Sequence, residues 1–182
     1  MISLRILAAA TAFAAGFAGT AFANPMVGGA PMYQQKNIVE NAMNSKDHTT
    51  LVAAVKAGGL VDTLESAGPF TVFAPTNEAF AALPAGTVDT LLKPGNKATL
   101  DKILTYHVVA GRLDSATLDS AIESGGGKTT LKTVEGETLW VSGSGNALTV
   151  TDEKGDTADV TIPNVYQSNG VIMVVDKVLM PN

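Results

Sequence analysis

The sequence predicts an α+β fold in a single domain, because helical and strand patterns dominate different halves of the chain. Between residues 38 and 122, apolar residues recur mainly every three or four positions, as they do on one face of a helix. From residue 128 onward the spacing changes to two, which is typical of strands with one buried face. Helices early and strands late in one chain favour the α+β class.

Residues 1–23 have the features of a secretory signal peptide. Arg5 supplies a positive charge, an apolar stretch begins near Ile6, and Ala21-Phe22-Ala23 has the small-x-small pattern of a cleavage site. We expect cleavage after Ala23 and a secreted or periplasmic protein. The alternative, a retained membrane anchor, is disfavoured because the stretch is rich in Gly and Ala. No later segment is long enough to cross a bilayer.

Composition limits the kinds of partner. Removal of Arg5 changes the formal net charge from −5 to −6, and the remaining 159 residues contain no run of basic residues. Nucleic acid is therefore not an expected partner, because phosphate binding needs clustered Lys and Arg. The chain has no cysteine, so neither a bacterial lipid anchor nor disulfides are available. Stability must come from a hydrophobic core, which a domain of this size can bury.

The expected elements follow one another from the cleavage point. Residues 24–35, rich in Pro, Gly and Met, are predicted to be a flexible N-terminal arm before a domain at 36–182. Helices are predicted around residues 38–42, 51–64 with a break at Gly58-Gly59, 76–83, 87–92, 96–104 and 115–122. Strands are predicted at residues 70–74, 105–113, 129–134, 138–142, 147–151, 157–162 and 170–180. The last strand is apolar on both faces, which indicates a central strand covered on both sides.

The stretch Gly68–Phe80, GPFTVFAPTNEAF, is a strand followed almost at once by a helix. Pro75 lacks a backbone N–H and ends the strand ladder. Thr76 or Asn77 can cap the following helix, and Glu78 in its first turn complements the helix dipole. The stretch has no Cys, His or Lys, so we interpret the junction as architecture and not as a catalytic loop.

The sequence contains no catalytic constellation. The segment GGGKTT at residues 125–130 ends like a phosphate-binding loop, but Ile122 stands where that motif requires a glycine. Ser142 and Ser144 lie among glycines without forming the GxSxG pattern of hydrolases. We therefore expect no enzymatic activity, and we expect His107, which lies between apolar residues, to be a hydrogen-bonded structural residue.

Two groups of side chains have the chemistry of metal ligands. The first surrounds a Lys-Gly turn and consists of Asp152, Glu153, Asp156 and Asp159. It lacks EF-hand spacing, so a solvated hairpin tip is the better interpretation. The second group, Met26, Met32 and His48, combines two thioethers with an imidazole, ligands that suit Cu(I).

Three segments together resemble the fasciclin domain family. Gly68–Phe80 resembles the first signature block of that family, TYHVV at residues 105–109 resembles its Tyr-His element, and NGVIMVVDKVLMP at residues 169–181 resembles its second block. The segments occur in the family's order and at its spacing, and the resemblance covers residues 36–182. It implies a wedge-shaped β-sandwich with several helices, acting as an extracellular adhesion module without enzymatic activity.

The resemblance also implies where a partner would bind. The recognition residues of the family correspond here to Tyr106, His107, Pro163, Asn164, Val165 and Tyr166. Asn164 stands where the family motif has Asp, and Val165 stands where it has Ile, which removes the carboxylate that an integrin-type contact uses. Met173 occupies a place where many relatives have His.

Two functions stay open on the sequence alone. The first is a monomeric adhesion or surface-interaction module that binds an extracellular protein or polysaccharide without a cofactor. It requires that residues such as Tyr106 and Tyr166 are exposed. The second is a periplasmic ligand- or copper-binding protein that uses the Met-containing arm, which requires that Met26, Met32 and His48 can meet around one ligand.

Overall fold

The computed structural model describes residues 24–182, and the predicted signal peptide lies outside the described residues. The described residues form these α-helices: α1 Ile38–Asn44, α2 Thr49–Gly58, α3 Val61–Glu65, α4 Asn77–Ala81, α5 Thr87–Leu91, α6 Lys97–Tyr106 and α7 Ser115–Ser124. Short 3₁₀ turns occupy Lys46–His48 and Pro94–Asn96. The strands are β1 Met26–Val27, β2 Ala30–Pro31, β3 Phe70–Pro75, β4 Val108–Ala110, β5 Lys128–Lys132, β6 Thr138–Ser144, β7 Ala147–Thr151, β8 Thr157–Gln167 and β9 Gly170–Val175.

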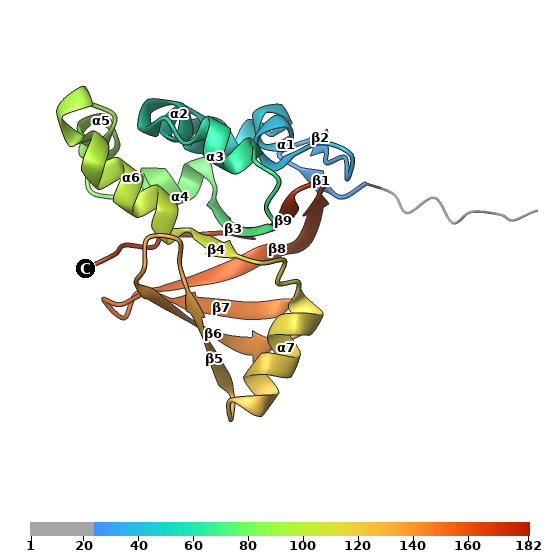
Figure 1. Ribbon diagram of the computed structural model, residues 1–182. Helices are drawn as coiled ribbons and strands as arrows, with labels where there is room; N and C mark the ends of the chain where they lie inside the picture. Colours follow the sequence, from blue (N-terminus) through green and yellow to red (C-terminus); the bar gives the residue numbers. More distant parts are fainter. Residues whose placement is uncertain (1–23) are drawn as a thin grey trace, which may run out of the picture.

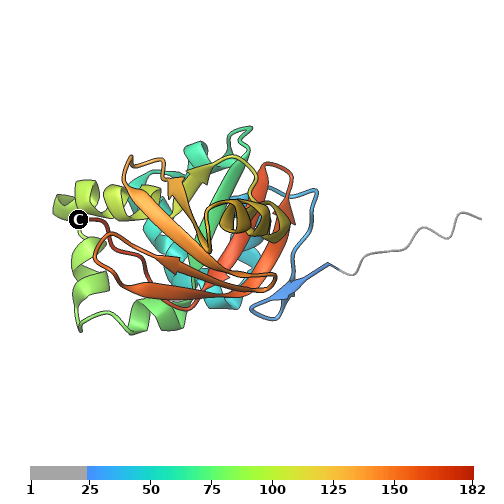
Figure 2. The ribbon, with the colours of Figure 1, turned by 90° about the horizontal axis from the view of Figure 1, so that it is seen from below.

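Seven strands form one strongly curved sheet in the order β4-β3-β9-β8-β7-β6-β5. β3 and β9 are parallel, and the other neighbours are antiparallel. Val109 bridges to Thr133, and the Val134 N–H donates to the Val108 carbonyl at 2.7 Å, so the sheet curls until its two edges meet (Figure 2). Helices α1–α6 lie on one side of the sheet, while α7 packs against β5 and β6 (Figure 1).

β9 separates two hydrophobic cores. All six of its residues are buried. Ile172 and Val174 belong to the core shared with the helices, whereas Val171, Met173 and Val175 belong to the core inside the curled sheet. The prediction of a central strand covered on both faces is therefore confirmed, as is the α+β fold class.

The strand-to-helix junction is also confirmed. Pro75 is the last residue of β3, and the Thr76 hydroxyl accepts a hydrogen bond from the Ala79 N–H at 3.2 Å, so Thr76 is the cap of α4. Asn77 has a different task. Its side-chain oxygen accepts from the Thr50 N–H at 3.0 Å, at the start of α2, and its amide donates to the Lys46 carbonyl at 2.8 Å.

Two predicted strands are wrong in extent. The stretch 105–113 is predicted as one strand, but α6 runs through Tyr106, His107 caps that helix, and only Val108–Ala110 pairs in the sheet. The helix continues because Ile103, Leu104 and Tyr106 all face the core. The last strand ends at Val175 and not at residue 180. The next residue, Asp176, accepts a hydrogen bond from the Asp159 N–H through its carboxylate at 2.8 Å.

The N-terminal arm packs against the domain. It forms the hairpin β1–β2, with Val27 and Met32 buried. Asn41, itself buried, brackets the backbone of Tyr33: it accepts from the Tyr33 N–H at 2.9 Å and donates to the Tyr33 carbonyl at 2.7 Å. The sequence predicts a flexible segment outside the domain, whereas the structure places two of its side chains in the core. From residue 24 on, no helix has the length and apolar character needed to cross a bilayer.

Candidate functional site

An open groove contains two of the residues that the sequence proposes as contacts, Asn164 and Tyr166. Its volume is about 790 Å³. We call it the Tyr166 groove, and its lining residues are Pro25, Gln34, Arg112, Asn164, Tyr166, Gln167 and Ser168. These residues come from the arm, from the segment after β4 and from the end of β8. The fold, and not any local motif, therefore assembles the groove.

Asn164 is held in place by the start of α7. β8 loses its regular register against β9 around this residue, and Asn164 has a φ of 59°, a left-handed conformation that Asn adopts more readily than most residues. Its side-chain oxygen accepts from the Ser115 N–H at 2.8 Å, and its amide donates to the Ser115 hydroxyl at 2.7 Å. The side chain of Asn164 thus joins β8 to α7.

Tyr166 is fixed through the cap of the same helix. Its hydroxyl donates to the Asp114 carboxylate at 3.2 Å, and Asp114 also accepts from the Thr117 N–H at 2.9 Å as the N-cap of α7. The hydrogen bonds from Thr117 hold the pKa of Asp114 below its usual range, while burial raises the pKa of Tyr166. At neutral pH the pair is therefore a carboxylate that accepts from a protonated phenol, which limits rotation of the half-buried ring.

Arg112 is the cation of the groove. Its guanidinium donates to the Gln167 carbonyl at 2.9 Å. This is the one hydrogen bond of the guanidinium to the described residues, and a guanidinium carries five N–H donors. Donors therefore remain that can contact a partner lying in the groove.

The floor of the groove is a buried polar network. Gln167 is only 2% exposed, and its side chain donates to the Val165 carbonyl at 3.2 Å and accepts from the Asn41 amide. Asn169, also buried, accepts from the Ile38 N–H at 3.0 Å and donates to the Leu64 carbonyl at 2.7 Å. These bonds tie the β8–β9 turn to α1 and α3, so the groove has a rigid base.

The groove offers several kinds of polar contact beside an aromatic ring. The exposed side chains of Gln34, Arg112 and Ser168 can hydrogen-bond to hydroxyl, carbonyl or carboxylate groups. The amides of Asn164 and Gln167 are instead engaged within the domain. Its lining residues include no histidine, carboxylate or cysteine. The arrangement is suited to holding a polar partner and does not provide a nucleophile with an adjacent base.

Three of the proposed contact residues are corrected by their burial. Tyr106 and Val165 are fully buried and His107 is 2% exposed, so none of them presents a side chain to a partner in this structure. Of the remaining candidates, Pro163 is half-buried but does not line the groove. Of the six contact residues proposed from the sequence, Asn164 and Tyr166 line the groove.

Tyr106 and His107 have structural tasks. The Tyr106 hydroxyl donates to the Thr138 carbonyl at 2.9 Å and accepts from the Glu153 N–H at 3.1 Å, and burial raises its pKa. His107 bonds to the Ile103 carbonyl through Nδ1 at 2.8 Å and accepts from the Leu179 N–H at Nε2 at 3.0 Å. Burial lowers the pKa of His107 to about 4, which keeps the ring neutral.

The possible copper ligands do not converge. Met32 and His48 are buried and line one cavity, whereas Met26 is 58% exposed and does not line it. The Nδ1 atom of His48 is already engaged with the Ser45 hydroxyl at 2.8 Å. Among residues 24–182, no three His, Cys, Asp or Glu side chains are grouped as a metal site, so the acids of the 152–159 turn do not form one. Asp152 is instead buried and accepts from the backbone N–H groups of Lys154, Asp156 and Met180.

The comparison with protein families decides the identity of the fold. The model of the fasciclin domain matches residues 46–181. The chain belongs to the fasciclin domain family. Both signature blocks quoted above lie within the matched residues, and the first is the β3–α4 junction while the second contains β9.

Fasciclin relatives occur in bacteria and animals. The chain is 47% identical over 146 residues to protein sll1483 of Synechocystis sp., covering 79% of this chain and 73% of that protein. It is 40% identical over 152 residues to immunogenic protein MPB70 of Mycobacterium bovis, covering 81% and 70%. It is also 40% identical over 131 residues to transforming growth factor-beta-induced protein ig-h3 of Sus scrofa, covering 72% of this chain but 17% of that protein.

A solved structure shares the fasciclin fold. The domain pair from the insect cell adhesion molecule Fasciclin I superposes with a TM-score of 0.71 at 16% identity, covering 80% of this chain and 51% of that chain. At this identity the likeness concerns the fold alone. The particular side chains of the Tyr166 groove must be judged from their own chemistry.

Most residues of the Tyr166 groove could not be identified from the sequence. Gln34, Arg112 and Ser168 are not part of any recognised motif, and Gln34 belongs to the arm that is predicted to lie outside the domain. One signal was available: Arg112 is the only arginine after the predicted signal peptide. Its meaning depends on the contact with Gln167, 55 positions later in the sequence.

Proposed function

We propose that this protein is a secreted or periplasmic surface-interaction module that binds an extracellular protein or polysaccharide through the Tyr166 groove. It acts as a monomer, without enzymatic activity and without a cofactor. The observation that carries the proposal is the placement of an aromatic ring, a guanidinium and the exposed side chains of Gln34 and Ser168 on one rigid base. Tyr and Arg are, with Trp, enriched among the side chains that dominate binding at protein interfaces.

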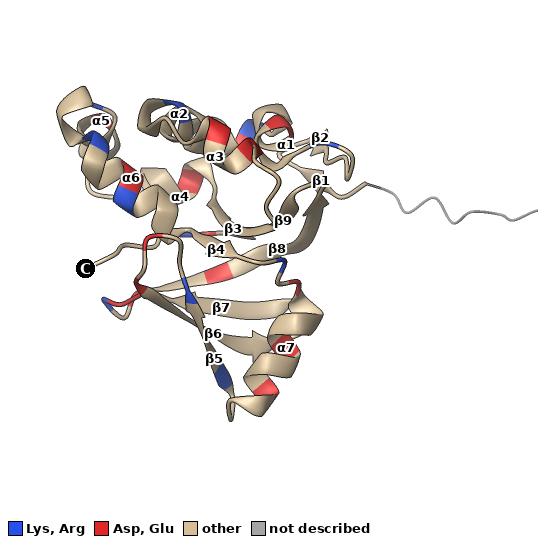
Figure 3. Cartoon of the chain, in the orientation of Figure 1, with Lys and Arg blue, Asp and Glu red and all other residues tan. Residues whose placement is uncertain are grey.

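A polar partner is favoured by the chemistry of the groove. The lining residues supply hydrogen-bond donors and acceptors around the Tyr166 ring, a combination that suits a sugar chain or an extended peptide. Acidic and basic residues are scattered over the helices and the sheet (Figure 3). Long-range attraction to a strongly charged surface is therefore not the proposed basis of recognition, and contacts within the groove are.

The proposed location and role agree with the family. A family member is described as an insect cell adhesion molecule, and another relative, 35% identical, is named a cell surface glycolipoprotein. Export to the periplasm or the cell exterior would place the groove where matrix proteins and polysaccharides occur. The predicted signal peptide supports the same location.

The test measures binding of residues 24–182 to an array of immobilised matrix proteins and polysaccharides. Each binder found is then titrated against Tyr166→Ala and Arg112→Gln. Lys93→Gln is the matched control, because it removes the same charge from an exposed position beyond α5, at the other end of the molecule (Figure 1). Thermal unfolding of each variant confirms that the fold is retained.

We expect each groove variant to weaken binding by about tenfold or more, in line with the loss of a central contact residue. The control should bind as the wild type does. Binding that survives both groove variants would place the contact surface elsewhere. The absence of any binder on the array would remove the support for adhesion.

A further inference from the structure

The single cation of the Tyr166 groove distinguishes between kinds of polar partner. Arg112 is exposed, and among the lining residues it is the one that carries a charge. In the part of the chain that the structure describes, the ion pairs all involve Lys97 or Lys102, so Arg112 has no carboxylate partner there. Its hydrogen bond to the Gln167 carbonyl orients the guanidinium and leaves other N–H donors for a ligand.

The guanidinium lies beside the aromatic ring and an acid that is already engaged. Burial raises the pKa of Tyr166, and the charge of Arg112 acts against this rise, which indicates that the two side chains are close. The Asp114 carboxylate accepts from the Tyr166 hydroxyl at 3.2 Å and from the Thr117 N–H at 2.9 Å. Asp114 also caps α7, so the helix dipole offsets its charge. Arg112 is therefore free to pair with a carboxylate that a ligand brings.

The other exposed groups of the groove suit a sugar ring. A planar guanidinium binds a carboxylate through two parallel N–H···O bonds, which are roughly twice as strong as neutral hydrogen bonds. The half-buried ring of Tyr166 offers an apolar face on which the C–H side of a sugar can pack. Gln34 and Ser168, both exposed, can hydrogen-bond to sugar hydroxyls. A uronic acid combines a carboxylate, a C–H face and hydroxyls in one unit.

An extended peptide fits this part of the molecule less well. β7 pairs with residues 157–159 of β8, whereas residues 160–167 pair with β9 alone among the described strands, so the outer edge of this part is open. Pro163 has no N–H, the register against β9 shifts on either side of Ile162, and Asn164 is bonded to α7. Proline and irregular register discourage the addition of a further strand at an edge.

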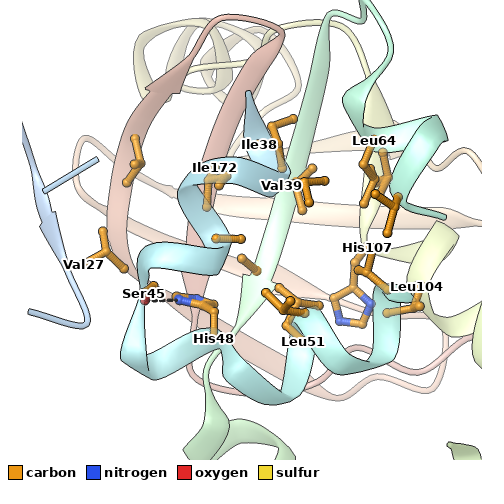
Figure 4. Close-up of a pocket in the computed structure, with 18 of the residues that line it drawn as sticks. Val27, Ile38, Val39, Ser45, His48, Leu51, Leu64, Leu104, His107 and Ile172 are labelled. Carbon is orange, nitrogen blue, oxygen red and sulfur yellow. Dashed lines mark hydrogen bonds between the residues drawn. The ribbon is translucent and has the colours of Figure 1, made fainter. Parts of the chain in front are cut away.

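The enclosed cavity between helices α1–α3 and the sheet does not compete with the groove for such a ligand. Its volume is about 40 Å³, and its walls are almost wholly apolar, among them Val39, Leu51 and Ile172 (Figure 4). The Tyr166 groove measures about 790 Å³ and is open to solvent. A sugar chain therefore has room in the groove and not in the cavity.

We propose that the Tyr166 groove binds an acidic polysaccharide built from uronic acid units, with the carboxylate of one unit paired to Arg112 and the sugar chain packed on Tyr166. The proposal rests on the function proposed for the groove and narrows its partner to one class. With the predicted signal peptide removed, the net charge is −6, so an acidic polymer is repelled at a distance. At physiological ionic strength this repulsion is screened beyond about 8 Å, and the contact inside the groove decides the affinity.

The experiment titrates residues 24–182, at physiological ionic strength, with the trisaccharide of galacturonic acid and with its methyl ester. Backbone amide resonances are followed by NMR. The ester keeps the sugar chain and removes the negative charges, so the pair of ligands isolates the carboxylate contact. The acid should bind about tenfold more tightly than the ester, and its shifts should fall on the amides of Arg112, Tyr166 and Ser168.

Variants assign the preference to one side chain. Arg112→Gln should bind the acid and the ester with affinities within about twofold of each other. Lys36→Gln is the matched control, because the Lys36 carbonyl accepts from the Ser168 N–H at 3.0 Å but Lys36 does not line the groove. This control removes the same charge nearby and should keep the preference for the acid. Tyr166→Ala should weaken both ligands, and thermal unfolding checks the fold of each variant.

The possible failures are distinguishable. Equal affinity of the wild type for acid and ester overturns the carboxylate contact; if Tyr166→Ala abolishes that binding, the function proposed for the groove still stands. A preference that Lys36→Gln reduces as much as Arg112→Gln also overturns the proposal, because general charge attraction then explains it. Equally tight binding of a triglutamate peptide would assign the groove to acidic peptides instead. No response to any of these ligands overturns the proposal, and the function of the groove falls with it if the array of matrix proteins and polysaccharides also yields no binder.

Discussion

Lowering the pH from 7 to 5 should destabilise this fasciclin domain through His107. The neutral His107 ring accepts a hydrogen bond from the Leu179 N–H at Nε2, and its Nδ1 is hydrogen-bonded to the Ile103 carbonyl. Protonation of Nε2 removes the acceptor and places a charge in a site that is 2% exposed. The hydrogen bond that protonation would break holds the C-terminal segment, where Val178 and Leu179 are buried, against the end of α6, so the folded state resists protonation.

The magnitude follows from the pKa of His107, which burial lowers from 6.5 to about 4. Because the folded-state pKa lies below the unfolded one, the unfolded chain binds more protons. The contribution is therefore complete above pH 6.5 and is lost as the pH falls towards 4. Each unit in that window corresponds to about 1.4 kcal/mol, so the step from pH 7 to pH 5 should cost about 2 kcal/mol.

Urea unfolding at pH 7, 6 and 5 measures this loss for the wild type and for His107→Asn. Asparagine can still donate to the Ile103 carbonyl but does not titrate, so this variant should lose about 2 kcal/mol less than the wild type between pH 7 and 5. His48→Leu is the matched control, because it removes the other histidine and leaves the His107 term in place. Equal pH slopes for the wild type and His107→Asn would refute the reasoning.

Three further outcomes are expected. Val174→Asp should unfold the domain in a thermal scan, because an unpaired carboxylate in the core costs several kcal/mol; an unchanged midpoint would contradict the two-sided burial of β9. Asn164→Ala should lose about 1–3 kcal/mol in urea unfolding, since both hydrogen bonds to the start of α7 disappear, whereas Asn164→Asp should stay close to the wild type. Copper should not raise the thermal midpoint, because Met26 is exposed and Met32 is buried; a rise that Met26→Leu removes would show that the arm rearranges around the ion.

The parts of this fold that follow from sequence are those set by neighbours in the chain. The two-sided apolar pattern of β9 and the Pro75–Thr76 stop-and-cap are local signals, and both have the expected structural result. The end of α6 is different. Tyr106 and His107 lie among β-branched and apolar residues that favour a strand, but their side chains bond to residues 138 and 179, far away in the sequence. Those tertiary contacts override the local preference.

The Tyr166 groove could be predicted only in part for the same reason. Asn164 and Tyr166 are indicated by the resemblance, but their conformation depends on Ser115 and Asp114, about 50 positions earlier. The sequence does not indicate that the arm contributes to the groove, because its Pro, Gly and Met residues form no periodic pattern. Its placement comes from Asn41, whose buried side chain brackets the backbone of Tyr33.

The substitution of Asn for Asp at position 164 has a structural meaning in this chain. Both polar atoms of the Asn164 side chain are engaged with Ser115 at the start of α7, so they face inward and not towards the groove opening. A carboxylate could make the same two contacts, because the Ser115 N–H and hydroxyl can both donate to it. In either case the residue joins β8 to α7 and sets the position of Tyr166, which is bonded to the cap of that helix. Recognition by this domain should therefore depend on Tyr166 and Arg112, while residue 164 helps to set the position of Tyr166 through α7.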